Sequence, residues 1–239
     1  MPDHPITSTN EDKVVRHQSA EAGPMEKSCE ILKEKRGLNM KMTKRDIAIM
    51  EFIHEFWFCE ITQIEQKFGL KKPRSYQIMQ RLVREKLVIH ERVFHGRNGI
   101  FYLSRLGASH FDLPAMTNVP IAIYDHQLAI IDMYFKLMHL YPEAQWVSER
   151  KLIRDRFAKG IGSIGHVADG LLVFPDDKQI AIEVELTMKG KLRLEKIFKA
   201  YAGQFQIKEI WYFCSPEIVS KMQKAAEGRS YIKIHGLRS

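Results

Sequence analysis

The stretch QIAIEVELTMK (residues 179–189) alternates apolar and polar side chains with the two-residue period of a β-strand. One face of this strand carries only aliphatic side chains, those of Ile180, Ile182, Val184 and Leu186. The other face carries Glu183 and Glu185, whose carboxylates repel each other and are costly to bury without a counter-charge. Mg²⁺ and Mn²⁺ prefer carboxylate oxygens and remove that cost. The stretch therefore predicts a strand that holds a divalent metal ion.

A third carboxylate lies on the strand expected just upstream, VADGLLVF (residues 167–174). Thirteen residues separate Asp169 from Glu183, so we expect the two strands to be neighbours and the carboxylates of Asp169, Glu183 and Glu185 to meet. The alternative is that the acidic face is the solvated side of an edge strand. Apolar side chains in the next helical segment favour a covered sheet, namely Leu192, Leu194, Ile197, Phe198 and Tyr201.

The sequence around these two strands alternates between helix and strand signals. Helices are expected at 124–140, 189–204 and 216–227, further strands at 144–150, 209–214 and 231–235, and a basic, glycine-containing loop at 151–165. This order predicts an α/β domain with a mixed sheet over residues 121–239. A short proline-containing linker at 112–120 precedes it.

The preceding segment, residues 41–114, has a different order of elements. Helices are expected at 43–55, 61–70 and 71–87, followed by a hairpin within 88–104. FWFCE (residues 56–60) is expected to be a short aromatic link, and Gly69 to end the second helix. The third helix carries six Lys and Arg between residues 71 and 86 against one Glu.

Helix, helix, basic helix and hairpin in this order resembles the winged helix-turn-helix family. The resemblance implies that the third helix enters the DNA major groove and that the hairpin wing contacts phosphate or the minor groove. The implied contacts are Arg74, Gln77, Arg81 and Arg84 on the helix and Arg97 at the wing tip. The alternative is a protein–protein module with a solvated charged face.

The motif Asp169-Gly170, followed by Glu183-Val184-Glu185 on an apolar strand and then a basic helix, resembles the PD-(D/E)xK restriction-endonuclease-like nucleases. The resemblance implies a catalytic site in which Asp169 and Glu183 bind Mg²⁺ or Mn²⁺. Position 185 departs from the usual Lys of that family. Either Glu185 is a third metal ligand and base, or Lys189 supplies the cation.

Other residues enter through the same resemblance. Glu149 takes the place of an upstream acidic residue that often completes the metal shell. Lys191 and Arg193 on the helix, together with Arg150, would contact the DNA backbone. The implied reaction is metal-assisted hydrolysis of a phosphodiester, in which the ion polarises the phosphate and lowers the pKa of the attacking water.

A winged helix followed by a restriction-like nuclease further resembles the MobC-type plasmid relaxases and the replication-relaxation proteins. This resemblance implies a strand-specific nickase acting on plasmid DNA at the origin of transfer, with a coupling protein and accessory mobilisation proteins as partners. Two alternatives remain open. One is a catalytically inactive winged-helix regulator of replication or transfer, and the other is a double-strand endonuclease of a restriction or transposition system.

The histidines show no spacing typical of the commoner relaxases, which need a His-hydrophobic-His motif. We expect His126 and His166 to be core or surface residues rather than metal ligands. Tyr201 follows the basic helix and is expected to be a core aromatic residue.

Composition agrees with a DNA-binding protein of the cytoplasm. The net charge is +8, and residues 41–114 carry 13 Lys and Arg against 8 Asp and Glu. The three cysteines are isolated, no stretch is long and apolar enough to span a membrane, and no signal peptide is expected. Residues 1–40 are expected to be a largely disordered arm with a possible helix at 25–36.

Overall fold

The computed structural model describes residues 42–111, 114–160 and 165–237. The arm at 1–40 and its possible helix lie outside the described residues. Residues 40–239 form one compact unit by their contacts. The boundary between 41–114 and 121–239 stays a prediction. None of the described helices is long and apolar enough to cross a membrane.

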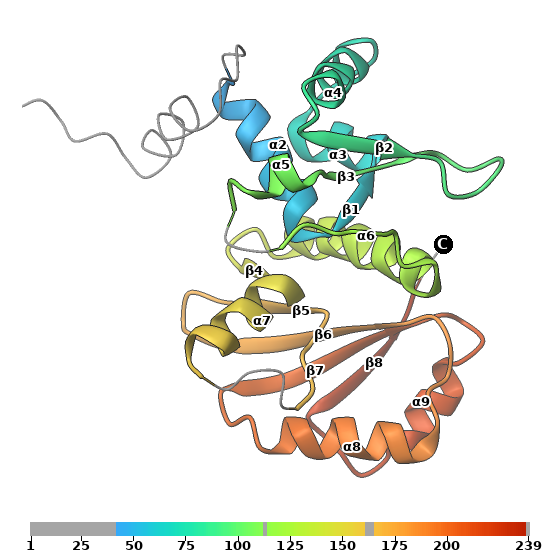
Figure 1. Ribbon diagram of the computed structural model, residues 1–239. Helices are drawn as coiled ribbons and strands as arrows, with labels where there is room; N and C mark the ends of the chain where they lie inside the picture. Colours follow the sequence, from blue (N-terminus) through green and yellow to red (C-terminus); the bar gives the residue numbers. More distant parts are fainter. Residues whose placement is uncertain (1–41, 112–113, 161–164, 238–239) are drawn as a thin grey trace, which may run out of the picture. The chain divides into compact units, whose positions relative to one another are not determined.

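The first part of this unit is a winged helix-turn-helix, as predicted (Figure 1). Its elements are α2 (Lys44–Glu55), β1 (Phe58–Glu60), α3 (Ile61–Phe68), α4 (Arg74–Arg84), β2 (Val88–Glu91), β3 (Ile100–Leu103) and α5 (Arg105–Ala108). The strands form an antiparallel sheet in the order β1-β3-β2. The wing is the loop between β2 and β3.

Local sequence signals fix the helix ends. The Thr43 hydroxyl accepts a hydrogen bond from the amide of Asp46 at 3.2 Å, and the Asp46 carboxylate accepts one from the amide of Thr43 at 2.9 Å. Gly69 ends α3 in the left-handed conformation with φ 60°. The prediction of an aromatic link at 56–60 was wrong in part, because buried Phe58 and Cys59 pair with β3 as a strand.

The second part is a mixed sheet with helices on both faces, again as predicted. Its elements are η1 (Ile121–Ile123), α6 (Tyr124–Leu140), β4 (Gln145–Ser148), α7 (Glu149–Ala158), β5 (Gly170–Val173), β6 (Gln179–Glu185), α8 (Lys191–Ala202), β7 (Ile207–Cys214), α9 (Val219–Ala225) and β8 (Ile232–Gly236). The strand order is β4-β5-β6-β7-β8. The pairs β4-β5 and β5-β6 are antiparallel, whereas β6-β7 and β7-β8 are parallel.

The predicted loop at 151–165 was wrong over its first half, where the chain forms α7. The Ser148 hydroxyl accepts a hydrogen bond from the amide of Lys151 at 3.3 Å and caps this helix. Glu149 lies in the first turn of α7, where the positive end of the helix dipole stabilises a carboxylate. The cap and the acidic first turn explain why a basic stretch forms a helix here.

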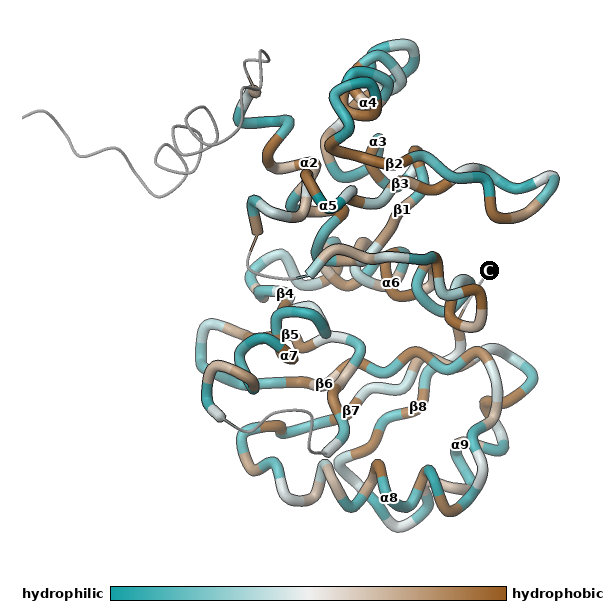
Figure 2. Tube along the Cα trace, viewed as in Figure 1, coloured by the Kyte–Doolittle hydropathy of each residue, from teal (hydrophilic) through white to brown (hydrophobic). Residues whose placement is uncertain are grey.

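β6 is central and covered on both faces, so the edge-strand alternative was wrong. α6 packs on β6, while α8 buries Leu194, Ile197 and Phe198 in one core with Ala181 of β6. Figure 1 shows α6 on one side of the sheet and α8 with α9 on the other. In Figure 2 hydrophobic segments run along the strands between these helices.

Gly170 sits where the sheet leaves no room for a side chain. A Cβ atom at this position would lie 2.1 Å from the indole ring of Trp146. Gly170 faces Ser148 of β4 and Ile182 of β6 in the register, so it lies between two strands. Gly170 therefore has a structural reason in this position, because only a residue without a side chain lets β5 approach Trp146 directly after Asp169.

Candidate nucleic-acid interface and acidic cluster

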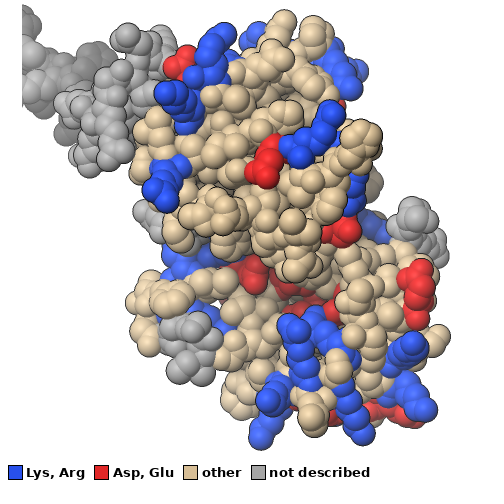
Figure 3. All heavy atoms as spheres, turned by 45° about the vertical axis from the view of Figure 1, so that its right-hand side comes forward, with Lys and Arg blue, Asp and Glu red and all other residues tan. Residues whose placement is uncertain are grey.

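Four carboxylates gather around the β5–β6 pair. Asp169 immediately precedes β5, Glu183 and Glu185 lie on β6, and Glu149 starts α7. Glu183 is 1% exposed and Glu185 is 4% exposed. In the face of the molecule that Figure 3 shows, acidic side chains lie in a hollow, with Lys and Arg side chains beside it. We call Glu149, Asp169, Glu183 and Glu185 the acidic cluster.

The carboxylate of Asp169 is held against β6. Its Oδ2 accepts a hydrogen bond from the amide of Val184 at 2.8 Å and lies 3.3 Å from Nε2 of His126. The same nitrogen lies 2.9 Å from the carbonyl oxygen of Val184, so it carries the proton and donates to both acceptors. Burial opposes the charged imidazole, but the hydrogen bond and charge of Asp169 outweigh it and raise the pKa of His126.

Glu183 is held by two partners from different elements. Its Oε1 lies 2.6 Å from Nε2 of His166, and the hydroxyl of Tyr201 on α8 donates to the same oxygen. Burial raises the pKa of Glu183, and the charge of Asp169 adds to this, although His166 and Tyr201 act in the opposite direction. A buried carboxyl group close to a second carboxylate is the kind of group that a cation stabilises.

Glu185 pairs with Lys189, four residues further on. Burial lowers the pKa of Lys189, while the charges of Glu183 and Asp169 partly restore it. The ammonium group of Lys189 therefore interacts with Glu185, Glu183 and Asp169 and neutralises part of the cluster. Which of Glu185 and Lys189 fills the third motif role stays a prediction.

Glu149 belongs to the same cluster. Burial raises the pKa of its carboxyl group first, and the charges of Asp169 and Glu183 raise it further. Glu149 therefore lies near enough to Asp169 and Glu183 for their charges to act on it. Its role there stays a prediction.

The cluster has no ready-made metal geometry. Within the described residues, no group of three or more His, Cys, Asp or Glu side chains is arranged to hold a metal ion. One observation nevertheless fits a further polar ligand. The hydroxyl of Tyr212, beside Glu183 in the β6–β7 register, is buried and has no hydrogen-bond partner among the described residues. Metal binding by Asp169, Glu183 and Glu185 stays a prediction.

His126, His166 and Tyr201 are the residues that sequence reasoning missed. Each contacts a carboxylate of the cluster, although none was expected to do so. No local spacing in the sequence indicates these contacts, because His126 lies in α6, His166 lies before β5 and Tyr201 lies in α8. The only signals in the sequence are that His166 lies three residues before Asp169 and that His126 lies in the first turn of an apolar helix.

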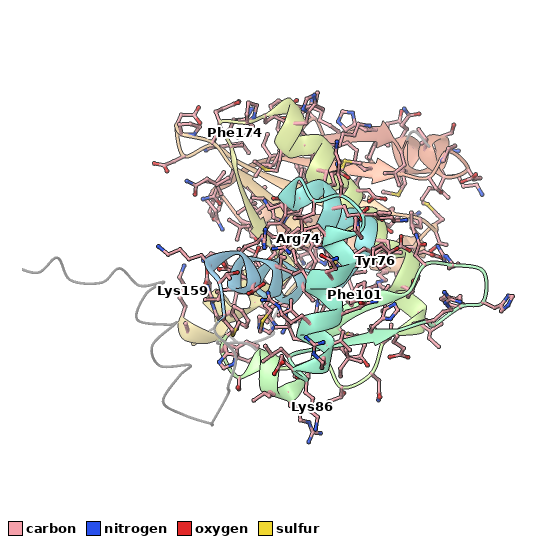
Figure 4. The ribbon with its side chains drawn as sticks, turned by 90° about the horizontal axis from the view of Figure 1, so that it is seen from above. Arg74, Tyr76, Lys86, Phe101, Lys159 and Phe174 are labelled. Carbon is pink, nitrogen blue, oxygen red and sulfur yellow. The ribbon has the colours of Figure 1, made fainter. Side chains whose placement is uncertain are left out.

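The outward face of α4 gathers most of the predicted DNA contacts. A groove of about 360 Å³ is lined by Arg74, Gln77, Gln80, Arg81 and Arg84, together with the inner residue Ile78. Figure 4 looks down on α4 from above, with Arg74 and Tyr76 labelled. Arg81 also pairs with the buried carboxylate of Asp46, so its charge is already partly neutralised.

Arg97 turns from the wing toward α6. Its Nη1 donates a hydrogen bond to the Asp125 carboxylate at 2.6 Å, and its guanidinium lies 5.1 Å from the centre of the Tyr124 ring. The hydrogen bond and charge of Asp125 raise the pKa of Arg97. Arg97 is 43% exposed, but a phosphate would have to compete with Asp125 for it.

The prediction that Arg150 contacts DNA was wrong. Arg150 is 3% exposed, and its guanidinium donates to the carbonyl oxygens of His54 at 2.9 Å and Pro114 at 2.7 Å. It also lies 3.9 Å from the centre of the Trp57 ring. Burial lowers the pKa of Arg150 to about 10. Lys191 and Arg193, by contrast, are exposed in the first turn of α8.

No protein-family model matches the chain, and no curated protein matches it. Among solved structures, the adhesin competence repressor AdcR of Streptococcus pyogenes is 15% identical over 58% of this chain and 95% of its own, with a TM-score of 0.24. The archaeal chromatin protein TrmBL2, whose structure is described as showing a novel mode of DNA binding, is 8% identical over 90% of this chain and 82% of its own, with a TM-score of 0.25. Likenesses this distant carry no argument, and the fold rests on the geometry described above.

Proposed function

We propose that this protein binds double-stranded DNA through its winged helix. The observation that carries the proposal is the groove on α4, where Arg74, Gln77 and Arg84 face solvent from one helix. Arginine side chains bind phosphates and guanine edges, and glutamine reads adenine, so this set can both anchor and select. Arg81 is expected to contribute less to DNA binding, because its guanidinium already pairs with the carboxylate of Asp46.

Substitution on this face tests the proposal. In Arg74→Ala and Arg84→Ala, duplex affinity is expected to fall, and the slope of log affinity against log salt to shrink by about 0.9 for each lost phosphate contact. Gln77→Ala is expected to reduce discrimination between sequences by about 1–3 kcal/mol. Fluorescence anisotropy over a salt series measures both effects. Lys221→Ala on α9 is the control, and equal behaviour of all four variants would contradict the proposal.

A second candidate function is metal-dependent nicking of the bound DNA, as in plasmid mobilisation at an origin of transfer. The acidic cluster favours it, because the charges of Asp169 and Glu183 act on Glu149 and Lys189, just before α8, pairs with Glu185. A bound Mg²⁺ or Mn²⁺ would polarise the scissile phosphate and lower the pKa of a water molecule. Asp169, Glu183 and Glu185 would hold that ion, while Lys191 and Arg193 would contact the DNA backbone.

The same geometry also suits an inactive winged-helix regulator. Donors from the protein itself, His126, His166, Tyr201 and Lys189, already satisfy the carboxylates. Nicking therefore requires that an ion displace or join these donors. A double-strand endonuclease is the remaining alternative, for which linear plasmid would be the product. The partners implied by mobilisation, a coupling protein and accessory proteins in the cytoplasm, belong to this second candidate.

Relaxation of supercoiled plasmid separates these functions. Open circles formed with Mg²⁺ or Mn²⁺, and not with EDTA, would support nicking. Binding without cleavage under any metal would support the regulator.

A further inference from the structure

An open groove lies on the α6 side of the sheet, beside the end of that helix. It has a volume of about 490 Å³ and is lined by α6, β7 and β8. This volume falls within the range of about 300–1,000 Å³ that is typical of small-ligand sites. None of its residues belongs to the acidic cluster or to the groove on α4.

Aromatic rings form much of this groove. The ring centre of Trp211 lies 5.6 Å from that of Tyr141 and 5.8 Å from that of His235. Phe213 is buried, and its ring stacks on His235 at 5.1 Å. Trp211 is half-buried and His235 is exposed, so these rings are accessible from solvent. Every nucleobase can stack on such rings, whatever its sequence.

The charge at the groove is positive. Lys136 lies on its α6 side, and Lys233 faces Trp211 in the β7–β8 register. Among the described residues, neither ammonium group lies in a close ion pair, although the charge of Lys233 acts on Glu209 and lowers the pKa of that carboxyl group. The neighbouring carboxylate, Glu209, is already engaged, because it accepts a hydrogen bond from Nε1 of Trp211 at 2.7 Å and lies 3.4 Å from Nζ of Lys178.

We propose that this groove binds an unpaired stretch of nucleic acid, with a base against Trp211 and the adjoining phosphates at Lys136 and Lys233. Rings flanked by lysines match the alternation of bases and phosphates in a single strand. An aromatic side chain of a protein partner would use the rings but not the two ammonium groups. The site requires neither cleavage by the acidic cluster nor duplex binding by α4.

Anisotropy of labelled oligo(dT) tests the site. Trp211→Ala is expected to weaken binding about 10-fold, within the range of about 5- to 150-fold that loss of one stacked base entails. Lys136→Ala is expected to weaken binding. It should also reduce the slope of log affinity against log salt by the amount expected for about one phosphate contact. Trp211→Phe keeps a ring, so it should retain most of the affinity. The controls are Phe205→Ala, which removes a ring that is 86% exposed outside the groove, and Lys221→Ala.

The groove variants are expected to leave duplex affinity unchanged, which separates this site from α4. Circular dichroism shows whether Trp211→Ala is folded, and Lys136→Ala decides the matter if it is not. Oligo(dT) affinities that match those of the controls would overturn the proposal. Displacement of the oligonucleotide by dTMP at equal concentration of nucleotide units would also overturn it, because the site would then bind a free nucleotide.

Discussion

Asp169→Asn and Glu183→Gln are expected to abolish metal-dependent nicking if the acidic cluster is a nuclease site. Both variants keep the shape of the side chain and remove a negative charge that a cation needs. The expected loss is at least about 100-fold, the upper end of what removing an outer-shell partner of a metal costs. The measurement is the initial rate of open-circle formation from supercoiled plasmid.

The matched control is Glu227→Gln, an exposed carboxylate outside the cluster, which should nick at the wild-type rate. Binding of Mn²⁺, followed by electron paramagnetic resonance without DNA, gives a readout independent of activity. Both cluster variants should bind the ion more weakly. Nicking by either variant at the wild-type rate would exclude the cluster as the site of chemistry.

Arg150→Met is expected to produce the largest change in stability. It removes the donors to the carbonyl oxygens of His54 and Pro114 and the cation from the Trp57 ring, while keeping an apolar stem. Each hydrogen bond from a charged donor is worth about 1.5–3 kcal/mol, and relief of the buried charge offsets part of the loss. We therefore expect the free energy of unfolding to fall by about 2–4 kcal/mol.

Thermal unfolding measures this effect, at about 2–4 °C of Tm per kcal/mol for a chain of this size. Arg154→Met is the control, because Arg154 is 38% exposed and its only recorded ion pair among the described residues is with Asp155. A Tm for Arg150→Met within the error of the control would show that the buried guanidinium does not stabilise the protein.

Sequence patterns that extend over a few residues predicted the strands and helix ends that depend on neighbouring residues. The alternation at 179–189 gave β6 with its two carboxylates on one face, and Thr43 and Gly69 set the ends of α2 and α3. The pairing of β5 with β6 followed from the short separation of Asp169 and Glu183. These signals act over a few residues, so a single sequence is enough to detect them.

The same reasoning did not predict contacts between residues that are far apart in the sequence. Arg150 lies in a basic stretch and was expected at a DNA surface, but it is buried and donates to the carbonyl oxygens of His54 and Pro114. Tyr201 was expected in the core, which is correct, yet its hydroxyl meets Glu183 from another element. Partners this distant in the chain leave no periodicity, and their positions depend on how the elements pack.

The central claim is that α4 docks on duplex DNA, and photo-crosslinking tests it most directly. Gln77 replaced by benzoylphenylalanine should crosslink to duplex DNA on irradiation, and the yield should fall as salt rises. The same replacement at Lys221 of α9 should give little product. Efficient binding with crosslinks from position 221 and none from position 77 would contradict the account.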